Sequence, residues 1–219
     1  GHLGSVDGVF VAPSRLSDEA LVEAQLVNPP VVDAALNKQR KIKEQRAPAG
    51  EGQLIRIDAT KLDQLIDLIG APFTTTLTAI DVMPTDHPLN LGMPGMHGAV
   101  AAVGALQRAD LLIAVGTRFD DRVTGRLDTF APGAKVIHAD IDPAEIGKNR
   151  HAEVPIVGDA RLTLTQLADS LEGKDLPDIS AWVRQLQRMQ QTYAPSWEEA
   201  PEPEISPQQV IQRIGALAP

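Results

Sequence analysis

The chain of 219 residues contains no cysteine, which excludes disulfide bonds and thiolate metal sites. Aromatic residues make up only 3% of it, and no apolar run approaches the roughly 20 residues that a membrane-spanning helix needs. The formal net charge of −9 argues against a nucleic-acid surface, because such surfaces gather positive charge. We therefore expect a cytoplasmic protein that has neither nucleic acid nor a membrane as its partner.

Several catalytic motifs are also missing from the sequence. No G-x-S-x-G string occurs, so a nucleophilic hydrolase has no support. The histidines at 87, 97, 138 and 151 lack metal-ligand spacing, so we expect no metal bound by the protein. His138, inside a predicted strand, is expected to be a buried and satisfied core residue. No G-x-G-x-x-G string occurs either, so the usual dinucleotide fingerprint is absent.

Short aliphatic segments alternate with helical ones between residues 53 and 179. Strands are expected at 71–77, 110–116, 135–141 and 154–159, and helices at 60–70, 98–109 and 161–173. The strands lack clean alternation of apolar and polar residues, which is typical of strands covered on both faces. This order predicts βαβ units, and hence an α/β fold with a Rossmann-like parallel sheet flanked by helices.

The two ends of the chain are predicted to be helical extensions of this domain. Residues 1–16 are expected to be a tag and irregular chain, and 17–52 a helix over 17–46 followed by a linker. A further strand is expected at 54–59. Residues 180–219 are expected to form a helix capped by Ser180, a proline-rich linker and a helix with Pro207 in its first turn, leading toward a C-terminal domain absent from the sequence.

Charged residues follow the predicted strands at positions where a ligand would bind. Gly116, Arg118 and Arg122 follow the second strand, and Asp140 closes the third. Ligands of parallel α/β sheets bind beyond the carboxyl ends of the strands, where arginines can hold phosphate and an acid can bond ribose hydroxyls. The pattern predicts a nucleotide site at this edge. The alternative is a solvated loop whose arginines pair with the neighbouring aspartates.

Five strings together carry a resemblance to a known family. They are "TTTL" (74–77), "LGMPGMHG" (91–98), "GTRFDDRVTG" (116–125), "AKVIHADIDPAEIGKN" (134–149) and "VPIVGDA" (154–160). From about residue 70 to 219, the chain resembles the central domain of the large subunit of acetohydroxyacid synthase, also called acetolactate synthase. That family joins two 2-oxo acids in branched-chain amino-acid biosynthesis, using thiamine diphosphate and Mg²⁺, and its central domain holds an FAD without a redox part in the main reaction.

The resemblance implies a set of FAD-binding residues when it is carried over motif by motif. These residues are Thr76, Leu77, Met96, His97, Gly116, Arg118, Asp120, Arg122, Val123, Asp140, Ile141, Asp159 and Ala160. The family's thiamine-activating glutamate and its G-D-G…N metal motif belong to other domains, and neither is found here. The resemblance therefore implies FAD binding and scaffolding, with no catalytic residue and no acetolactate production by this chain alone.

The N-terminal third departs from the acetolactate synthase pattern. The family opens this domain with a strand ending in consecutive glycines, and here the same place holds "QLIRIDATKLDQLIDLIG" (53–70). Residues 19–69 resemble the linker and dimerisation segment of a chemotaxis histidine kinase, without its ATP-binding motif. Two interpretations remain open: a divergent strand and helix complete the sheet, or an engineered or fused chain forms a homodimer through helices at 30–46 and 60–70, with an empty nucleotide groove.

Overall fold

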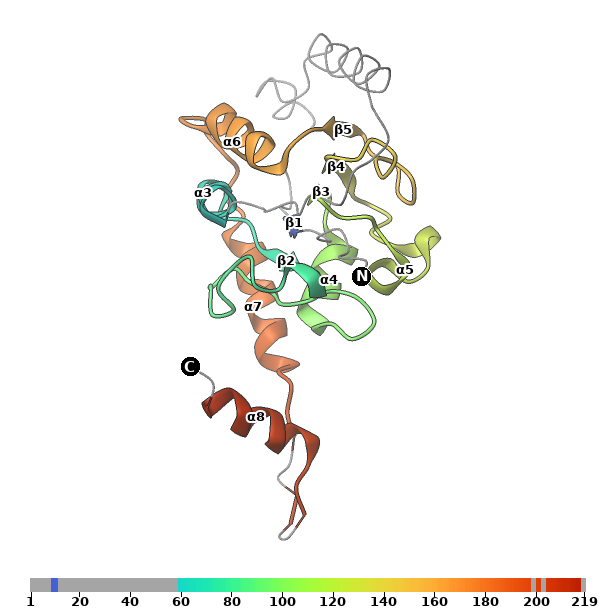
Figure 1. Ribbon diagram of the computed structural model, residues 1–219. Helices are drawn as coiled ribbons and strands as arrows, with labels where there is room; N and C mark the ends of the chain where they lie inside the picture. Colours follow the sequence, from blue (N-terminus) through green and yellow to red (C-terminus); the bar gives the residue numbers. More distant parts are fainter. Residues whose placement is uncertain (1–8, 12–58, 198–199, 202–203, 218–219) are drawn as a thin grey trace.

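The structure, a computed structural model, describes residues 9–11, 59–197, 200–201 and 204–217 (Figure 1). The helix expected over 17–46 lies outside the described residues, as does the strand expected at 54–59 except for its last residue. Ala59 begins a helix instead.

The described strands form one sheet in the order β2-β1-β3-β4-β5. Their bounds are Val9–Val11 for β1, Phe73–Thr75 for β2, Leu111–Val115 for β3, Lys135–Asp140 for β4 and Val154–Val157 for β5. The last three pair in parallel. This confirms the Rossmann-like α/β fold and the four strands predicted from residue 71 onward.

Strand β1 corrects the prediction that residues 1–16 are irregular. It lies between β2 and β3 and runs antiparallel to both. Because both neighbours oppose β1, β2 runs in the same direction as β3, so the sheet holds four parallel strands and one antiparallel strand. The sequence Val-Phe-Val favours a strand, but three residues are too few for a recognisable alternation.

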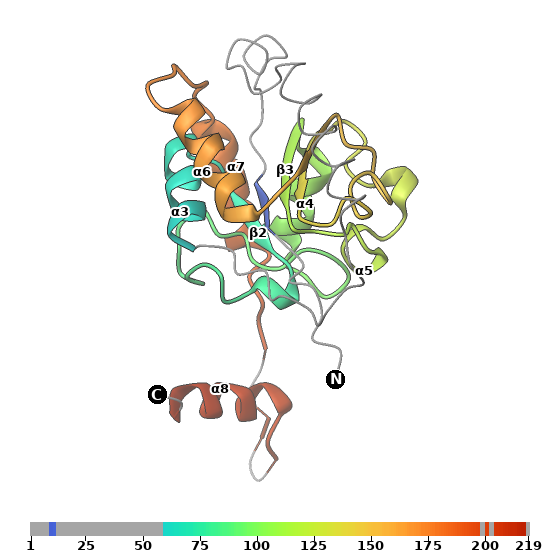
Figure 2. The same ribbon diagram turned by 45° about the horizontal axis from the view of Figure 1, so that its top comes forward.

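Helices cover both faces of this sheet. The helices α3 (Ala59–Ile69) and α6 (Ala160–Leu171) pack together on one face, and α4 (Val100–Arg108) covers the other (Figure 2). Strand β3 serves both layers, because its side chains alternate between the two faces: Leu111, Ile113 and Val115 pack with α3 and α6, whereas Leu112 and Ala114 pack beside α4. Thus β3 is buried on both faces, as predicted.

The helix α3 ends as its sequence predicts. Leu62, Leu65 and Ile66 are fully buried, and the N–H of Gly70 donates to the carbonyl of Ile66 at 2.7 Å. Gly70 has a φ of 65°, a left-handed conformation that glycine adopts at helix ends. The apolar face of α3 is therefore used inside the domain.

The helix α7 (Ser180–Thr192) starts differently from the prediction. Ser180 is its first helical residue rather than its cap, and its N–H donates to Oδ1 of Asp178 at 2.8 Å. This hydrogen bond lowers the pKa of the exposed Asp178 carboxyl. The carboxylate two residues upstream thus satisfies a free helical N–H, which a serine hydroxyl would otherwise do. Helix α7 packs on α4.

The last helix, α8 (Pro207–Leu217), begins with Pro207 as predicted. Ser206 and Gln209 form a capping box, in which the Gln209 N–H donates to Oγ of Ser206 at 3.2 Å and the Ser206 N–H donates to Oε1 of Gln209 at 2.7 Å. Helix α8 stands apart from the sheet (Figure 1). None of the described helices is long and apolar enough to cross a membrane.

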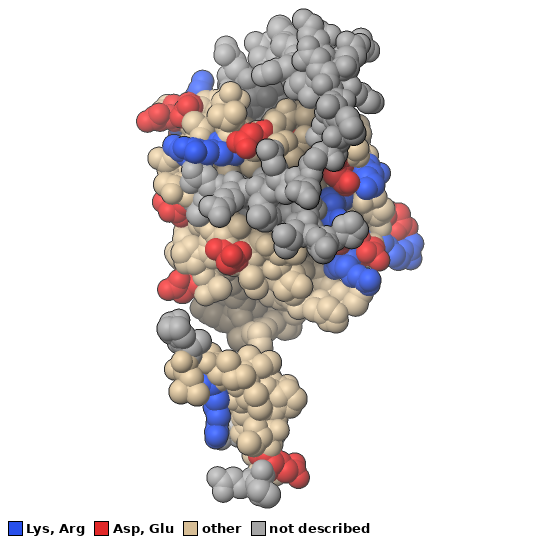
Figure 3. All heavy atoms as spheres, in the orientation of Figure 1, with Lys and Arg blue, Asp and Glu red and all other residues tan. Residues whose placement is uncertain are grey.

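Charge is mixed on the described part of the surface. On the face drawn in Figure 3, basic and acidic side chains are interspersed over the body of the domain. The described residues of this face therefore offer no broad patch of a single sign.

Candidate functional site

The register of the sheet brings the ends of its parallel strands to one edge. Thr75 and Val115 both lie opposite Val9 of β1. Val115 pairs in turn with Ala139, and Ala139 with Ile156. These residues form one row across the sheet, so the residues that follow them leave the sheet side by side.

We call this side of the molecule the carboxyl edge, and define it by Thr76, Gly116, Asp140 and Gly158, which follow or close the four parallel strands. The N–H of Gly116 donates to the carbonyl of Ala139 at 2.7 Å, and the N–H of Gly158 donates to the carbonyl of Asp140 at 3.0 Å. Ligands of parallel α/β sheets bind at such an edge.

A pocket of about 390 Å³ opens at the carboxyl edge. It lies between the end of β2, the loop 92–98 and the short helix α5 (Asp121–Thr124). Its lining includes seven residues that the sequence predicted to bind FAD: Thr76, Leu77, Met96, His97, Asp120, Arg122 and Val123. Thr78, Met93 and Pro94 complete it. These three were not predicted, although Met93 and Pro94 belong to a quoted string.

The remaining predicted residues do not line this pocket. Gly116, Arg118, Asp140 and Ile141 lie at the ends of β3 and β4, whereas Asp159 and Ala160 begin α6. The register places them at the same edge. The structure therefore brings seven predicted residues together and leaves six beside them.

Two of the predicted aspartates cap helices. Oδ1 of Asp120 accepts hydrogen bonds from the N–H groups of Arg122 and Val123 at 3.0 and 3.3 Å. Oδ1 of Asp159 accepts from the Leu162 N–H at 3.0 Å. Asp120 also lies 3.6 Å from the Arg118 guanidinium, a partly exposed contact of modest strength. The structure thus gives these carboxylates a structural role, and their contact with a cofactor stays a prediction.

Glycines of the loop 92–98 bring segments of protein backbone together. A Cβ atom on Gly95 would clash with the carbonyl oxygen of Arg122, and one on Gly98 with that of Met93. The Met96 N–H donates to the same Arg122 carbonyl at 3.0 Å. The loop therefore packs directly on α5, and this packing forms one side of the pocket.

His138 is buried as predicted but only half satisfied. Its side chain is fully enclosed, and its Nε2 lies 2.8 Å from the Thr117 carbonyl oxygen, to which an Nε2–H donates. Its Nδ1 has no partner among the described residues. Burial lowers the pKa of His138, against the opposing effects of the Thr117 carbonyl and the Asp140 and Glu145 carboxylates. Burial thus favours the neutral form of the imidazole.

Asp140 shares the same face of β4 two residues further on. It is 7% exposed, and its Oδ1 accepts from the Asp142 N–H at 2.8 Å. Burial raises the pKa of this carboxyl, although the Asp142 N–H and His138 act in the opposite direction. A largely buried carboxylate at a strand end is costly without a further donor, as expected of a residue that meets a polar ligand.

The His138 pKa predicts a loss of stability toward acidic pH. Because the pKa of His138 in the folded chain lies below 6.5, the unfolded chain binds the proton more readily. The contribution of this imidazole to the stability of the fold is therefore complete above about pH 6.5 and is lost as the pH falls through the folded pKa. We expect the unfolding free energy to fall with a slope of at most about 1.4 kcal/mol per pH unit from this one group. Urea unfolding at several pH values should show a smaller slope for His138→Gln than for the unchanged chain; equal slopes would contradict the assignment.

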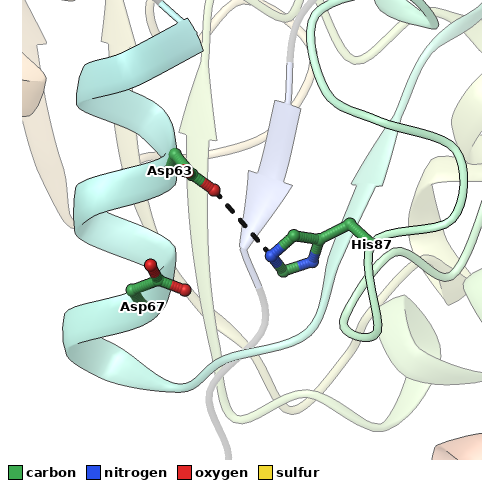
Figure 4. Close-up of side chains that lie close together, drawn as sticks. All are labelled: Asp63, Asp67 and His87. Atoms are coloured by element: carbon green, nitrogen blue, oxygen red, sulfur yellow. Dashed lines mark ion pairs between the residues drawn. The ribbon is translucent and has the colours of Figure 1, made fainter.

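A second group of side chains lies on helix α3 and in the loop that follows β2. Ligand-capable atoms of Asp63, Asp67 and His87 lie within 4.8 Å of one another (Figure 4). However, Nδ1 of His87 accepts a hydrogen bond from the Leu89 N–H at 3.2 Å, so the neutral ring carries its proton on Nε2, which faces Asp63 at 3.8 Å. A metal ligand needs the lone pair at that atom. The geometry fits a histidine–carboxylate pair.

Comparison with known proteins identifies the family of this fold and site. A family model described as the central domain of thiamine pyrophosphate enzymes matches residues 42–167. The chain belongs to this family. Its carboxyl edge is therefore the edge of a central domain of a thiamine pyrophosphate enzyme.

Several curated relatives of this chain are named acetolactate synthases. The chain is 54% identical over 171 residues to "Acetolactate synthase" of Mycobacterium bovis, which covers 76% of this chain and 28% of that protein. It is 51% identical over 166 residues to the large subunit of Corynebacterium glutamicum, covering 74% and 26%. For "Acetolactate synthase 1, chloroplastic" of Zea mays, identity is 40% over 200 residues, covering 89% and 31%. The chain spans less than a third of each relative.

The match also bears on the segment that resembled a histidine kinase. The family model begins at residue 42 and so includes residues 53–70. In the structure, α3 packs on α6, and its Leu62 and Leu65 lie in the main core. Both findings favour the interpretation that a divergent segment completes the domain. A homodimer formed through helices at 30–46 and 60–70 stays a prediction, and residues 19–58 lie outside the described part.

Proposed function

We propose that this chain is the central domain of an acetolactate synthase large subunit and binds FAD, or a related nucleotide, at its carboxyl edge. The pocket there carries the proposal, because it gathers seven residues that a family resemblance had assigned to FAD. The names of the relatives support the acetolactate synthase assignment.

The residues at the pocket fit such a cofactor. Arg122 offers a cation that can bond phosphate, and Thr76 and His97 offer polar groups, while Leu77, Met93 and Met96 provide apolar walls. The largely buried carboxylate of Asp140, at the neighbouring strand end, suits ribose hydroxyls. The volume falls within the range of about 300 to 1,000 Å³ found for small-molecule pockets.

The bound cofactor would hold parts of the enzyme together and would take no redox part in the main reaction. Thiamine diphosphate and Mg²⁺ would be held by residues that the printed sequence does not contain, so we propose that this chain alone makes no acetolactate. A role in a larger assembly agrees with relatives named as large subunits. Its cytoplasmic location stays a prediction.

Titration with FAD, followed by flavin fluorescence and calorimetry, tests this proposal. Arg122→Ala should weaken FAD binding by roughly 10- to 150-fold, because a hydrogen bond to a charged group contributes about 1.5 to 3 kcal/mol. The main-chain bonds of Arg122 to Asp120 and Met96 remain in this variant.

Arg126→Ala is the matched control for this experiment. Arg126 lies four residues further on, is exposed and pairs with Asp128. It does not line the pocket, so its removal should leave FAD affinity within about twofold, as for an exposed ion pair. Unchanged affinity in Arg122→Ala, or no FAD binding by the unchanged protein, would contradict the proposal.

A further inference from the structure

The loop between β3 and α5, residues 116–120, holds a strained backbone. Phe119 has a φ of 50° and is 1% exposed. A bulky residue rarely adopts this left-handed conformation, and it persists only where surrounding groups enforce it. Arginines lie on either side of Phe119: Arg122 lines the pocket, and Arg118 lies beside it at the end of β3.

One buried side chain enforces this conformation from the neighbouring strand. His138 of β4 donates from Nε2 to the Thr117 carbonyl oxygen at 2.8 Å. Its ring also packs edge-on against the Phe119 ring, with centroids 5.1 Å apart. On its other side, Phe119 packs against Phe130 at 6.1 Å. A single imidazole thus fixes both the carbonyl before Arg118 and the side chain after it.

The segment that follows β4 supplies a second hold on the same loop. Nδ2 of Asn149 donates to the carbonyl oxygen of Arg118 at 2.9 Å. Successive carbonyls, those of Thr117 and Arg118, are therefore both bound by side chains from the β4 strand and its following loop. Asp120 then caps α5, so the direction in which α5 begins depends on the same few residues.

We propose that His138 is a positioning residue of the nucleotide site: it locks the β3–α5 loop so that Arg118 and Arg122 face the carboxyl edge. Asn149 reinforces the lock at the surface. This inference rests on the proposed nucleotide-binding function, but the hold of His138 on the loop can be measured without any nucleotide.

Native-state proteolysis with trypsin measures directly how readily the loop opens, because Arg118 and Arg122 are cleavage sites within or beside it. His138→Leu keeps an apolar side chain against Phe119 but removes the donor to Thr117. We expect cleavage after these arginines to accelerate by about tenfold, the factor that corresponds to losing roughly 1.4 kcal/mol from one buried hydrogen bond. FAD and ADP affinities, measured by calorimetry, should fall by a similar factor.

Two further variants separate positioning from simple loss of stability. Ile137→Ala lies on the same strand but on its opposite face, in the cluster with α3 and α6, and should lower global stability without accelerating cleavage at the two arginines. His138→Gln places an N–H donor near the Nε2 position and should restore most of the protection and affinity. Should the leucine variant fail to fold, Asn149→Ala at the surface should still accelerate cleavage several-fold, and no acceleration there would overturn the proposal.

The outcomes of the proposed function and of this inference are distinguishable. Equal cleavage in His138→Leu and Ile137→Ala, at matched stability, overturns the hold of His138 on the loop. Faster cleavage with unchanged nucleotide affinity overturns the positioning role. If the unchanged protein binds neither FAD nor ADP, the proposed function and the positioning role both fail, and the cleavage ratio alone decides the hold of His138 on the loop.

Discussion

Gly95→Ala is expected to destabilise the domain by about 3 kcal/mol or more, the sum of a strained backbone and an overpacked contact. Gly95 has a φ of 94°, and a Cβ atom there would collide with the main chain of Arg122 and Val123. Backbone cannot move aside as a flexible side chain can. Either the loop 92–98 or α5 must shift, and both line the pocket, so FAD affinity should fall together with stability.

Gly147→Ala is the control that isolates the conformational part of this effect. Gly147 also has a left-handed φ, of 70°, but a Cβ atom there would meet nothing within 4 Å. Its replacement should cost only about 1 to 2 kcal/mol, the penalty of a left-handed residue. Urea unfolding of both variants measures the difference. Equal losses would mean that the contact between Gly95 and α5 is unimportant.

Leu65→Ala should lower the unfolding free energy by about 2 to 5 kcal/mol, as for other large-to-small changes in a core. Leu65 of α3 is fully buried in the cluster that joins α3, α6 and the sheet. The loss should appear in urea unfolding at every protein concentration, because the contacts are made within one chain.

Leu68→Ala on the same helix provides the comparison. Leu68 is 36% exposed, and its removal should change stability by less than about 1 kcal/mol, as for surface substitutions. A dimerisation helix would give the opposite result: the exposed leucine would matter, and the stability of Leu65→Ala would depend on protein concentration. Sedimentation of both variants at several concentrations distinguishes the two cases.

The sequence predicted the α/β fold because its signals are local. Short aliphatic strands, a helix that ends at Gly70 and a proline at the start of α8 are each specified within a few residues. Strand β1 was missed because three residues carry too little pattern, and its place between β2 and β3 depends on partners more than 60 residues away.

The candidate site, like the fold, could be predicted from the sequence only in part. The FAD-binding residues could be predicted from specific strings, and seven of these predicted residues do line the pocket. The capping role of Asp120 and Asp159 could have been predicted from their position before a helix, yet the family resemblance assigned both residues to a ligand instead. The hold of His138 on Thr117 could not be predicted, since nothing in the sequence relates a strand interior to a loop 21 residues before it.

By itself, the sequence determined the four parallel strands and the helices between them, which residues follow each of these strands, and that no cysteine chemistry is available to them. Only the tertiary structure decided that β2 runs with β3, that Gly95 packs on the backbone of α5, and that an imidazole from β4 locks the loop carrying Arg118. The physical reason is the distance along the chain over which each kind of interaction acts. Propensity and capping act within a turn or two of the chain, whereas register, close packing and buried hydrogen bonds join residues that only the folded state brings together.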